Sequence, residues 1–352
     1  MSGLHGLATR ALRLADPEDA HGLAITGLKL GLGPRRAAHD PILATSLAGL
    51  ALPNAIGLAP GFDKNAEVGD AMLAAGFGWV ECGTVTPLPQ AGNPRPRLFR
   101  LTEDRAVINR MGFNNQGLEA FAGRLAARRR QGVLGANIGA NKDAADRIAD
   151  YVTGLQRLWG LCDYFTLNIS SPNTPGLRAL QTRAALDELL GRTGEARRAA
   201  QKGVGGADTP VFLKVAPDLE DGEAEAITES AVAHGLGAII VSNTTLARPD
   251  SLRSAHRGEA GGLSGAPLMA PSTRVLRTFH QAAAGRIALV GVGGVASGAD
   301  AYAKIRAGAA AVQLYSALVF EGPGLVGDIR RDLAARLKAD GFRTLAEAVG
   351  AP

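Results

Sequence analysis

Residues 168–176 carry the densest set of side chains that could take part in chemistry. The stretch reads Asn-Ile-Ser-Ser-Pro-Asn-Thr-Pro-Gly and follows directly on an apolar run. Its prolines stiffen the backbone, and its asparagine amides and serine hydroxyls can both donate and accept hydrogen bonds. We therefore expect a polar turn at a reaction site, although two serines before a proline can also form a turn and nothing more.

Eight short runs of β-type residues recur along the chain. They cover residues 55–59, 79–83, 133–138, 164–169, 211–215, 238–242, 287–291 and 311–315. Between the runs, apolar residues recur at helical spacing, as at Val68, Met72 and Ala75. Strands that alternate with helices require a parallel sheet, and eight such units predict an α/β fold, a closed (β/α)8 TIM barrel.

Polar residues follow each of these runs. They are Asp63, Lys64, Thr84, Asn137, Asn168, Ser171, Asn173, Lys214, Asn243, Thr244, Gly293, Gly294, Tyr315 and Ser316. One polar residue after a strand usually caps a helix or forms a turn. Eight sets at the carboxyl ends of barrel strands instead predict an active site. The longer segments 84–114 and 243–270 are rich in proline, glycine and asparagine, so we expect them to form loops over the barrel mouth.

A glycine-rich turn at residues 291–294, with Tyr315 and Ser316 after the eighth run, falls where such barrels bind phosphate. This position favours a phosphorylated ligand, and flavin mononucleotide (FMN) is a natural candidate. Lys214 could form a Schiff base in a lyase, or place a positive charge beside a flavin ring. The chain has no GxGxxG nicotinamide fingerprint, no HExxH and no GxSxG motif.

Composition disfavours several other classes of protein. The net charge is +5, but the basic residues are scattered and residues 128–130 form the only tight arginine run, so nucleic acid is a weak hypothesis. Cys82 and Cys162 have no partner at metal-site or disulfide spacing, which predicts no metal site and a reducing cytosolic compartment. We find no apolar run of the ~20 residues that span a bilayer and no signal peptide.

Residues 1–40 are expected to form short amphipathic helices. Apolar positions such as Leu12, Leu14, Leu23 and Leu28 alternate with basic ones. Such helices can lie on a membrane surface, or they can cap the barrel floor.

Several motifs together resemble class 2 dihydroorotate dehydrogenases, the quinone-linked kind. The matching segments are residues 58–65, 83–87, 93–97, 108–115 (INRMGFNN), 168–176, 243–245, 261–265 and 291–294. The resemblance runs from about residue 16 to the C-terminus. It implies oxidation of (S)-dihydroorotate to orotate in pyrimidine biosynthesis, with FMN as cofactor and ubiquinone or a related quinone as acceptor.

The resemblance also assigns residues to ligands. It places FMN at Ala59, Pro60, Gly61, Phe62, Asp63, Lys64, Thr84, Asn137, Asn168, Lys214, Ser242, Gly265, Gly294, Tyr315 and Ser316. It places dihydroorotate at Lys64, Asn109, Arg110, Met111, Gly112, Phe113, Asn168, Asn173, Asn243 and Thr244. Ser171 matches the catalytic base, which must pass its proton onward because serine is a weak base, through Thr174 or a water in our hypothesis. A serine there, rather than a cysteine, indicates the quinone class.

The resemblance divides the chain into an N-terminal segment, 1–40, and a catalytic barrel, 41–352. It implies that the first segment associates with a membrane and forms a quinone tunnel, with His21 and Arg100 near the quinone. The resemblance thus favours a peripheral protein on the cytoplasmic face of the inner membrane, if bacterial, over the floor-capping alternative. A soluble acceptor, a Schiff-base lyase and a flavoprotein without turnover are the competing hypotheses.

Three residues depart from the family pattern. They are Pro60, Ser242 and Cys82. Pro60 lacks a backbone N–H, so any flavin contact through that amide is in doubt.

Overall fold

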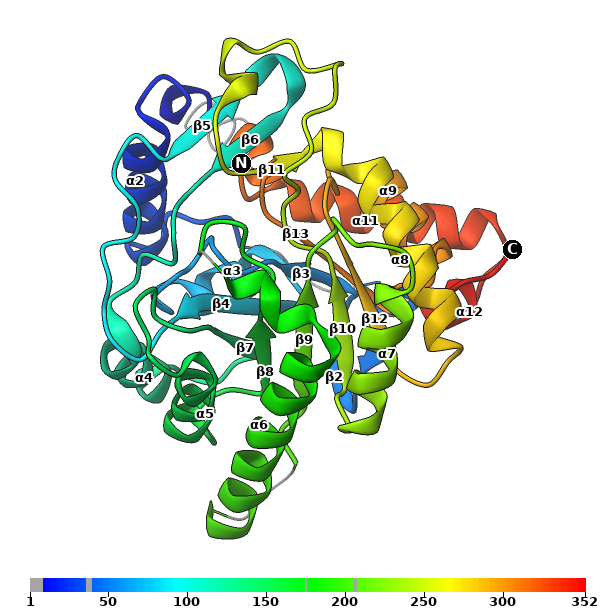
Figure 1. Ribbon diagram of the computed structural model, residues 1–352. Helices are drawn as coiled ribbons and strands as arrows, with labels where there is room; N and C mark the ends of the chain where they lie inside the picture. The colour runs from blue at the N-terminus through cyan, green and yellow to red at the C-terminus, as the bar shows by residue number, and fades with distance from the viewer. Residues whose placement is uncertain (1–8, 36–39, 175, 205–207) are drawn as a thin grey trace.

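Eight parallel strands close into a barrel with helices around it (Figure 1). The structure is a computed structural model that describes residues 9–35, 40–174, 176–204 and 208–352. The barrel strands are β3 (Ile56–Leu58), β4 (Trp79–Val85), β7 (Val133–Ile138), β8 (Tyr164–Asn168), β9 (Val211–Val215), β10 (Ala238–Val241), β12 (Ala288–Val292) and β13 (Ala311–Leu314). Each coincides with a run expected from the sequence, so the predicted TIM barrel is confirmed.

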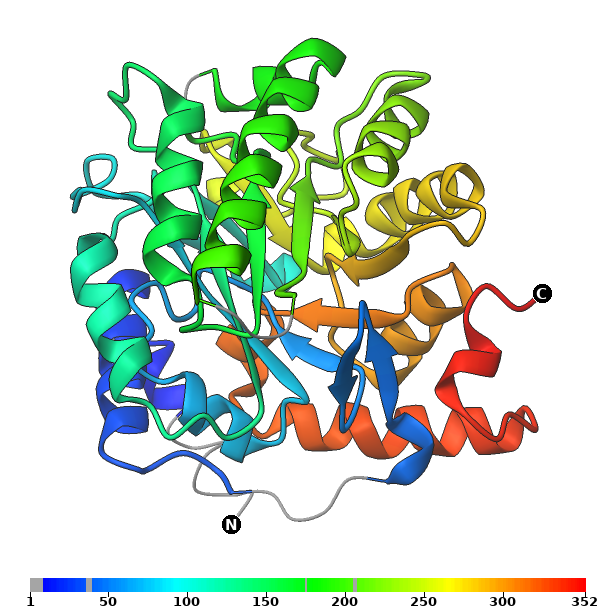
Figure 2. The same ribbon diagram turned by 90° about the horizontal axis from the view of Figure 1, so that it is seen from below.

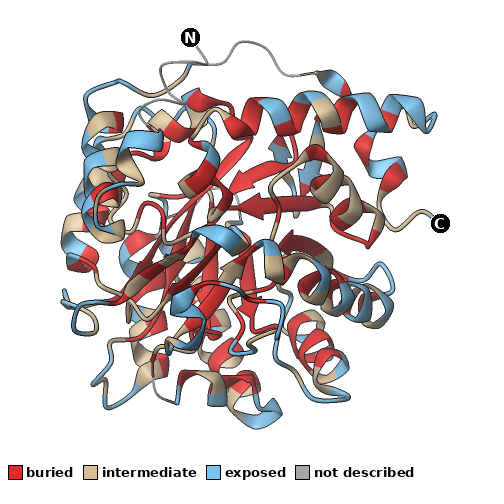
Figure 3. Cartoon of the chain, turned by 90° about the horizontal axis from the view of Figure 1, so that it is seen from above, coloured by how far each residue is buried: buried red, intermediate tan, exposed pale blue. Residues whose placement is uncertain are grey.

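Helices follow the strands and cover the outside of the barrel. They are α3 (Gly69–Ala75), α4 (Gly117–Ala127), α5 (Arg147–Leu158), α6 (Arg183–Val204), α7 (Glu223–Ala233), α8 (Met269–Ala283), α9 (Gly298–Arg306), α10 (Ala317–Glu321), α11 (Leu325–Ala339) and α12 (Leu345–Ala348). Because the strands are covered on both faces, they are buried almost throughout, whereas the helices expose their outer faces (Figure 3). Helix α6 extends beyond its neighbours.

A hairpin, and not a helical pair, covers the floor of the barrel. Strands β1 (Thr45–Leu47) and β2 (Leu50–Leu52) pair antiparallel (Figure 2). Leu47 and Leu52 are buried, and the Thr45 hydroxyl donates to the carbonyl of Ala310 just before β13. The hairpin therefore lies at the amino ends of the strands, which excludes the floor-capping alternative for the N-terminal helices.

A small antiparallel sheet lies over the barrel mouth, where the sequence predicted only loops. Strands β5 (Leu98–Leu101), β6 (Ala106–Asn109) and β11 (Gly262–Gly265) pair in the order β11-β6-β5. Phe99, Leu101, Ile108, Leu252 and Leu263 belong to a separate buried cluster beneath it. The expectation of loops was thus incomplete, because these two segments pair across 150 residues of chain and bury a core of their own.

Helix α2 (Pro17–Lys29) lies beside this small sheet (Figure 1). Its start is defined by Asp16, whose carboxylate accepts hydrogen bonds from the backbone N–H groups of Glu18 and Asp19. The predicted helical character of residues 1–40 is confirmed for α2 and for residues 9–12. Residues 1–8 and 36–39 lie outside the described part. Within that part, no helix is long and apolar enough to cross a membrane.

Candidate active site

A pocket of about 660 Å³ joins the carboxyl ends of the barrel strands to helix α2. Asn168, Ser171 and Lys214 line its inner end, while Ala20 and His21 of α2 line the other. The barrel, the small sheet and the N-terminal helix therefore contribute to one continuous space.

Most of the residues expected to bind ligands line this pocket. From the flavin set these are Ala59, Pro60, Gly61, Phe62, Lys64, Thr84, Asn168, Lys214, Ser242, Gly265, Gly294, Tyr315 and Ser316. From the substrate and quinone sets they are Asn109, Met111, Gly112, Phe113, Asn173, Asn243, Thr244, His21 and Arg100, together with the base candidate Ser171. Residues far apart in the chain meet here because they follow parallel strands.

Three expected residues lie outside the pocket wall. The Asp63 carboxylate is buried and accepts hydrogen bonds from the N–H groups of Glu67 and Val68, at 2.8 and 2.7 Å. Cys82, one of the departures from the family pattern, directs its Sγ toward the same carboxylate. Asp63 therefore organises the loop after β3 through its side chain.

Arg110 and Asn137 are the other two. Arg110 pairs with Glu259 at 2.8 Å, and its guanidinium lies 4.6 Å from the ring centre of Phe99. Asn137 is fully buried beneath the pocket and donates a hydrogen bond to Glu81 at 2.6 Å. Asn137 thus supports the pocket residues Thr84 and Asn168, whereas Arg110 contacts residues outside the pocket wall.

A network of amides and hydroxyls fixes the inner end of the pocket. Asn168 Nδ2 donates to Thr84 Oγ1 at 2.9 Å and to Asn137 Oδ1 at 3.3 Å. Its oxygen accepts from the Ser170 hydroxyl at 3.1 Å and from Asn243 Nδ2 at 3.4 Å. Because donors and acceptors alternate through this network, the orientation of the Asn168 amide is determined.

Ser171 lies in the pocket with little exposed surface. Its Oγ accepts a hydrogen bond from the backbone N–H of Asn173 at 3.2 Å. The Asn173 amide in turn donates to the backbone and side-chain oxygens of Asn109. Among the described residues, no hydrogen bond joins Ser171 to Thr174, so the relay through Thr174 stays a prediction.

Two lysines bring positive charge into the pocket. Lys64 Nζ donates to the carbonyl of Gly61 at 2.9 Å, and burial lowers the pKa of Lys64 to about 8. Lys214 is almost fully buried; burial lowers its pKa, and the negative charge of Glu81 opposes that shift. At neutral pH Lys64 is therefore mainly a cation and can bind a carboxylate.

Three glycines form another part of the pocket wall. Gly265, Gly293 and Gly294 have φ angles of 94°, 104° and 81°, which other residues rarely adopt. A Cβ at Gly294 would lie 2.5 Å from Met269 Cα. Only bare backbone fits here, as in sites where N–H groups approach a phosphate. The pocket wall thus fits a phosphorylated cofactor such as a flavin nucleotide.

Pro60 lines the pocket and has no N–H of its own to offer there. The N–H groups on either side of it, at Ala59 and Gly61, donate to the carbonyls of Leu314 and Gly83 within the barrel. The effect of Pro60 on flavin contacts therefore stays a prediction.

Aromatic rings separate the inner pocket from the part under α2. The His21 ring meets Phe62 edge-on at 5.4 Å, and Phe62 meets Tyr315 at 5.6 Å. Burial lowers the pKa of His21 to about 3, so the imidazole is neutral at physiological pH. Arg100 donates to the carbonyls of Arg13 and Ala15, which holds the chain that leads into α2.

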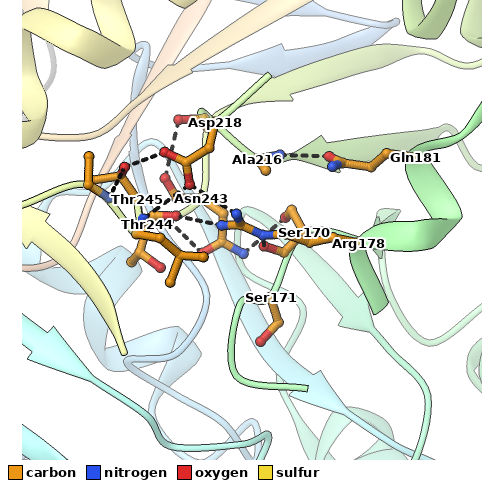
Figure 4. A network of polar contacts seen from close by, with 12 residues as sticks. Ser170, Ser171, Arg178, Gln181, Ala216, Asp218, Asn243, Thr244 and Thr245 are labelled. Atoms are coloured by element: carbon orange, nitrogen blue, oxygen red, sulfur yellow. Dashed lines mark hydrogen bonds and ion pairs between the residues drawn. The ribbon is translucent and has the colours of Figure 1, made fainter. Parts of the chain in front are cut away.

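The sequence interpretation missed the residues that brace the reactive loop. Arg178 donates to the carbonyls of Ser170 and Thr244, at 3.3 and 3.2 Å, and pairs with Asp218 at 2.9 Å (Figure 4). It thereby joins the loops that follow β8, β9 and β10. Ser171 lies beside this network with no dashed contact to it. Arg178 stands two residues past the motif, and its position there was the only signal.

Glu81 was also missed. It is a lone acid inside the apolar run of β4, and none of its surface is exposed. An acid is rarely buried unless it is paired. A lone glutamate in an apolar run was therefore the signal that could have indicated a buried, hydrogen-bonded carboxylate.

Comparisons with known proteins show the family of this chain. A sequence model described as Dihydroorotate dehydrogenase matches residues 42–337. The dihydroorotate dehydrogenase (quinone) of Parvibaculum lavamentivorans is 59% identical over 350 residues, covering 99% of this chain and 98% of the relative. That of Rhodospirillum rubrum is 58% identical over 337 residues, covering 96% and 91%. A crystal structure of DHODH from Eimeria tenella with ferulenol superposes with a TM-score of 0.92 at 39% identity, covering 95% of each chain.

Fold and pocket together define a (β/α)8 enzyme with its site at the carboxyl ends of the strands. The chain belongs to the dihydroorotate dehydrogenase family.

Replacing Arg178 with glutamine should loosen the loop that carries Ser171. Hydrogen bonds to charged groups contribute ~1.5–3 kcal/mol each, so local opening should become roughly tenfold or more frequent. Hydrogen exchange measured by mass spectrometry over residues 169–174 would report this. Arg183→Gln is the control, because Arg183 forms exposed ion pairs with Asp187 and Glu229. Equal exchange in both variants would contradict the bracing role.

Proposed function

We propose that this protein oxidises (S)-dihydroorotate to orotate in pyrimidine biosynthesis and passes the electrons through FMN to a membrane quinone. The observation that carries the proposal is the continuous pocket. Its inner end offers amides, a serine and lysines, whereas its outer end runs beneath α2. A polar substrate and an apolar acceptor can therefore be served by one site.

The pocket wall offers residues that would hold FMN. Gly265, Gly294 and Ser316 would hold its phosphate, and Lys214 would lie at the ring. When bound, FMN accepts a hydride from carbon and passes electrons onward. A buried positive charge such as that of Lys214 stabilises the negative charge that reduction adds.

Dihydroorotate has a carboxylate and a ring edge of amide donors and acceptors. Lys64 supplies the matching charge, and the amides of Asn109, Asn173 and Asn243 supply the matching edges. The Ser171 Oγ is positioned to remove a proton from carbon 5 while carbon 6 loses a hydride. Because Ser171 is almost fully buried, this proton cannot pass freely to bulk water and must leave through a specific neighbour or an ordered water.

The outer end of the pocket suits an apolar electron acceptor. Ala24, Leu28, Leu318 and Val319 line it, and neutral His21 adds no charge. Arg100 lines the pocket as well, together with Arg13 and Arg105. We assign this space to the head group of ubiquinone or a related quinone. The family match offers no support for the lyase alternative at Lys214.

The N-terminal segment also carries an apolar outer surface. Leu14, Leu23, Leu30 and Leu32 are 91%, 59%, 72% and 69% exposed. Basic residues accompany them, namely Arg10, Arg13, Lys29 and Arg35. Exposed leucines beside cations are typical of a surface that enters an anionic membrane interface. We therefore propose peripheral attachment to the cytoplasmic face of the inner membrane, through residues 9–35.

Replacing Ser171 with alanine should slow anaerobic reduction of the bound flavin by dihydroorotate about 10²- to 10⁴-fold, the usual contribution of a general base. Stopped-flow absorbance measures this rate directly, and unchanged flavin content confirms an intact site. Thr174→Ala is the companion variant: it should also slow reduction if Thr174 relays the proton, and leave it unchanged if a water does. An unaltered rate in Ser171→Ala would refute the assignment of the base.

Replacing Leu23 and Leu30 together with glutamine should weaken binding to anionic phospholipid vesicles roughly tenfold or more. Each leucine contributes at most ~1.5–3 kcal/mol when fully buried, and partial insertion contributes less. Cosedimentation with vesicles measures the change. The matched control is Leu88→Gln with Leu246→Gln, since these leucines are 68% and 52% exposed elsewhere on the surface. Equal losses in both double variants would rule out a specific membrane face.

A further inference from the structure

Glu81 is a buried carboxylate to which no role has yet been given. It lies on β4, between residues of the strand that are themselves fully buried. A carboxylate cut off from water costs several kcal/mol unless donors and a cation surround it. Its surroundings therefore indicate why the barrel retains it.

Three side chains from three other strands donate to Glu81. Asn137 Nδ2 of β7 donates to Oε1 at 2.6 Å. Gln313 Nε2 of β13 and the Tyr164 hydroxyl of β8 donate to Oε2, at 2.8 and 3.2 Å. Burial raises the pKa of Tyr164, and the charge of Glu81 raises it further, so the phenol keeps the proton that it donates. All three contacts suit an ionised carboxylate.

Glu81 is connected to the pocket in two ways. Through charge, it acts on Lys214, whose pKa is lowered by burial and raised by Glu81. Through hydrogen bonds, it holds Asn137 Nδ2, so that Asn137 Oδ1 faces Thr84 Oγ1 and Asn168 Nδ2. Each of these three partners, Lys214, Thr84 and Asn168, lines the pocket.

We propose that Glu81 is a positioning residue of the reaction. It fixes the Asn137 amide and places a buried negative charge two hydrogen bonds from Asn168, the residue opposite Lys214 in the β8–β9 pairing. The inner end of the pocket therefore presents one defined charge and one defined set of donors to the flavin. The proposal rests on FMN occupying this pocket. It goes beyond the proposed function because Glu81 touches neither substrate nor pocket.

The test compares the flavin midpoint potential as a function of pH in the holoenzyme and in Glu81→Gln. At the acidic end of the series, where Lys214 is protonated in both proteins, loss of the anion should make the potential more positive. As the pH rises, Lys214 should lose its proton earlier than in the wild type, so the difference should shrink and reverse. Equilibration with redox dyes measures the potentials of both proteins without dihydroorotate. A wrong substrate assignment would therefore leave this test unaffected.

Tyr164→Phe is the matched control, because it removes one donor to Glu81 and leaves the charge in place. The flavin midpoint potential of Tyr164→Phe should vary with pH as that of the wild type does. If Glu81→Gln also follows that curve, or if Tyr164→Phe shifts it equally, Glu81 does not act through its charge and the proposal is wrong.

A second variant covers the case in which Glu81→Gln does not retain flavin. Glu81→Gln with Asn137→Asp exchanges donor and acceptor across the 2.6 Å contact. All surrounding hydrogen bonds can persist while the carboxylate moves next to Thr84 and Asn168. With the anion closer to the flavin, the potential at the acidic end of the series should be more negative than in the wild type. An equal or more positive potential would overturn the proposal.

Discussion

The ion pair between Glu18 and Arg97 ties helix α2 to the segment that leads into β5, beside the mouth of the pocket. Arg97 Nη2 and Nε donate to the two Glu18 oxygens at 2.6 and 3.0 Å, and Arg97 also donates to the carbonyls of Ala91 and Asn93. Hydrogen bonding from Arg97 lowers the pKa of Glu18, which keeps the pair charged. Glu18 also pairs with Arg95 at 3.2 Å, so two arginines of the segment that leads into β5 hold α2 beside the barrel mouth.

Helix α2 faces the pocket on one side and the surface of the protein on the other. His21 contacts Phe62 and Tyr315 on its inner side, while Leu23, at the edge of the pocket, and Leu30, just after the helix, are largely exposed. The helix therefore separates the polar chemistry at the strand ends from the surface that we assign to the membrane. An acceptor that enters beneath α2 can approach the flavin site without passing through the water around the opposite loops.

Much of this arrangement could be predicted because it follows local rules. Barrel strands read as short apolar runs; Lys214 stands near the end of one run, and Ser171 follows another. The small sheet could not be predicted, since β6 and β11 are neighbours in space but half of the barrel strands lie between them in the sequence. Glu81 and Arg178 were missed for a related reason: their partners are backbone carbonyls and side chains on other strands, which no spacing in the chain reveals. Whether the assigned residues bind their ligands is still a prediction.

Reoxidation of the reduced protein tests the central claim, that electrons leave beneath α2 to a quinone. The flavin is first reduced anaerobically with dihydroorotate, and its absorbance is followed after addition of a short-chain quinone, fumarate or NAD⁺. We predict rapid recovery with the quinone and little with either soluble acceptor. Recovery with fumarate or NAD⁺ at a rate equal to that with the quinone would contradict the account.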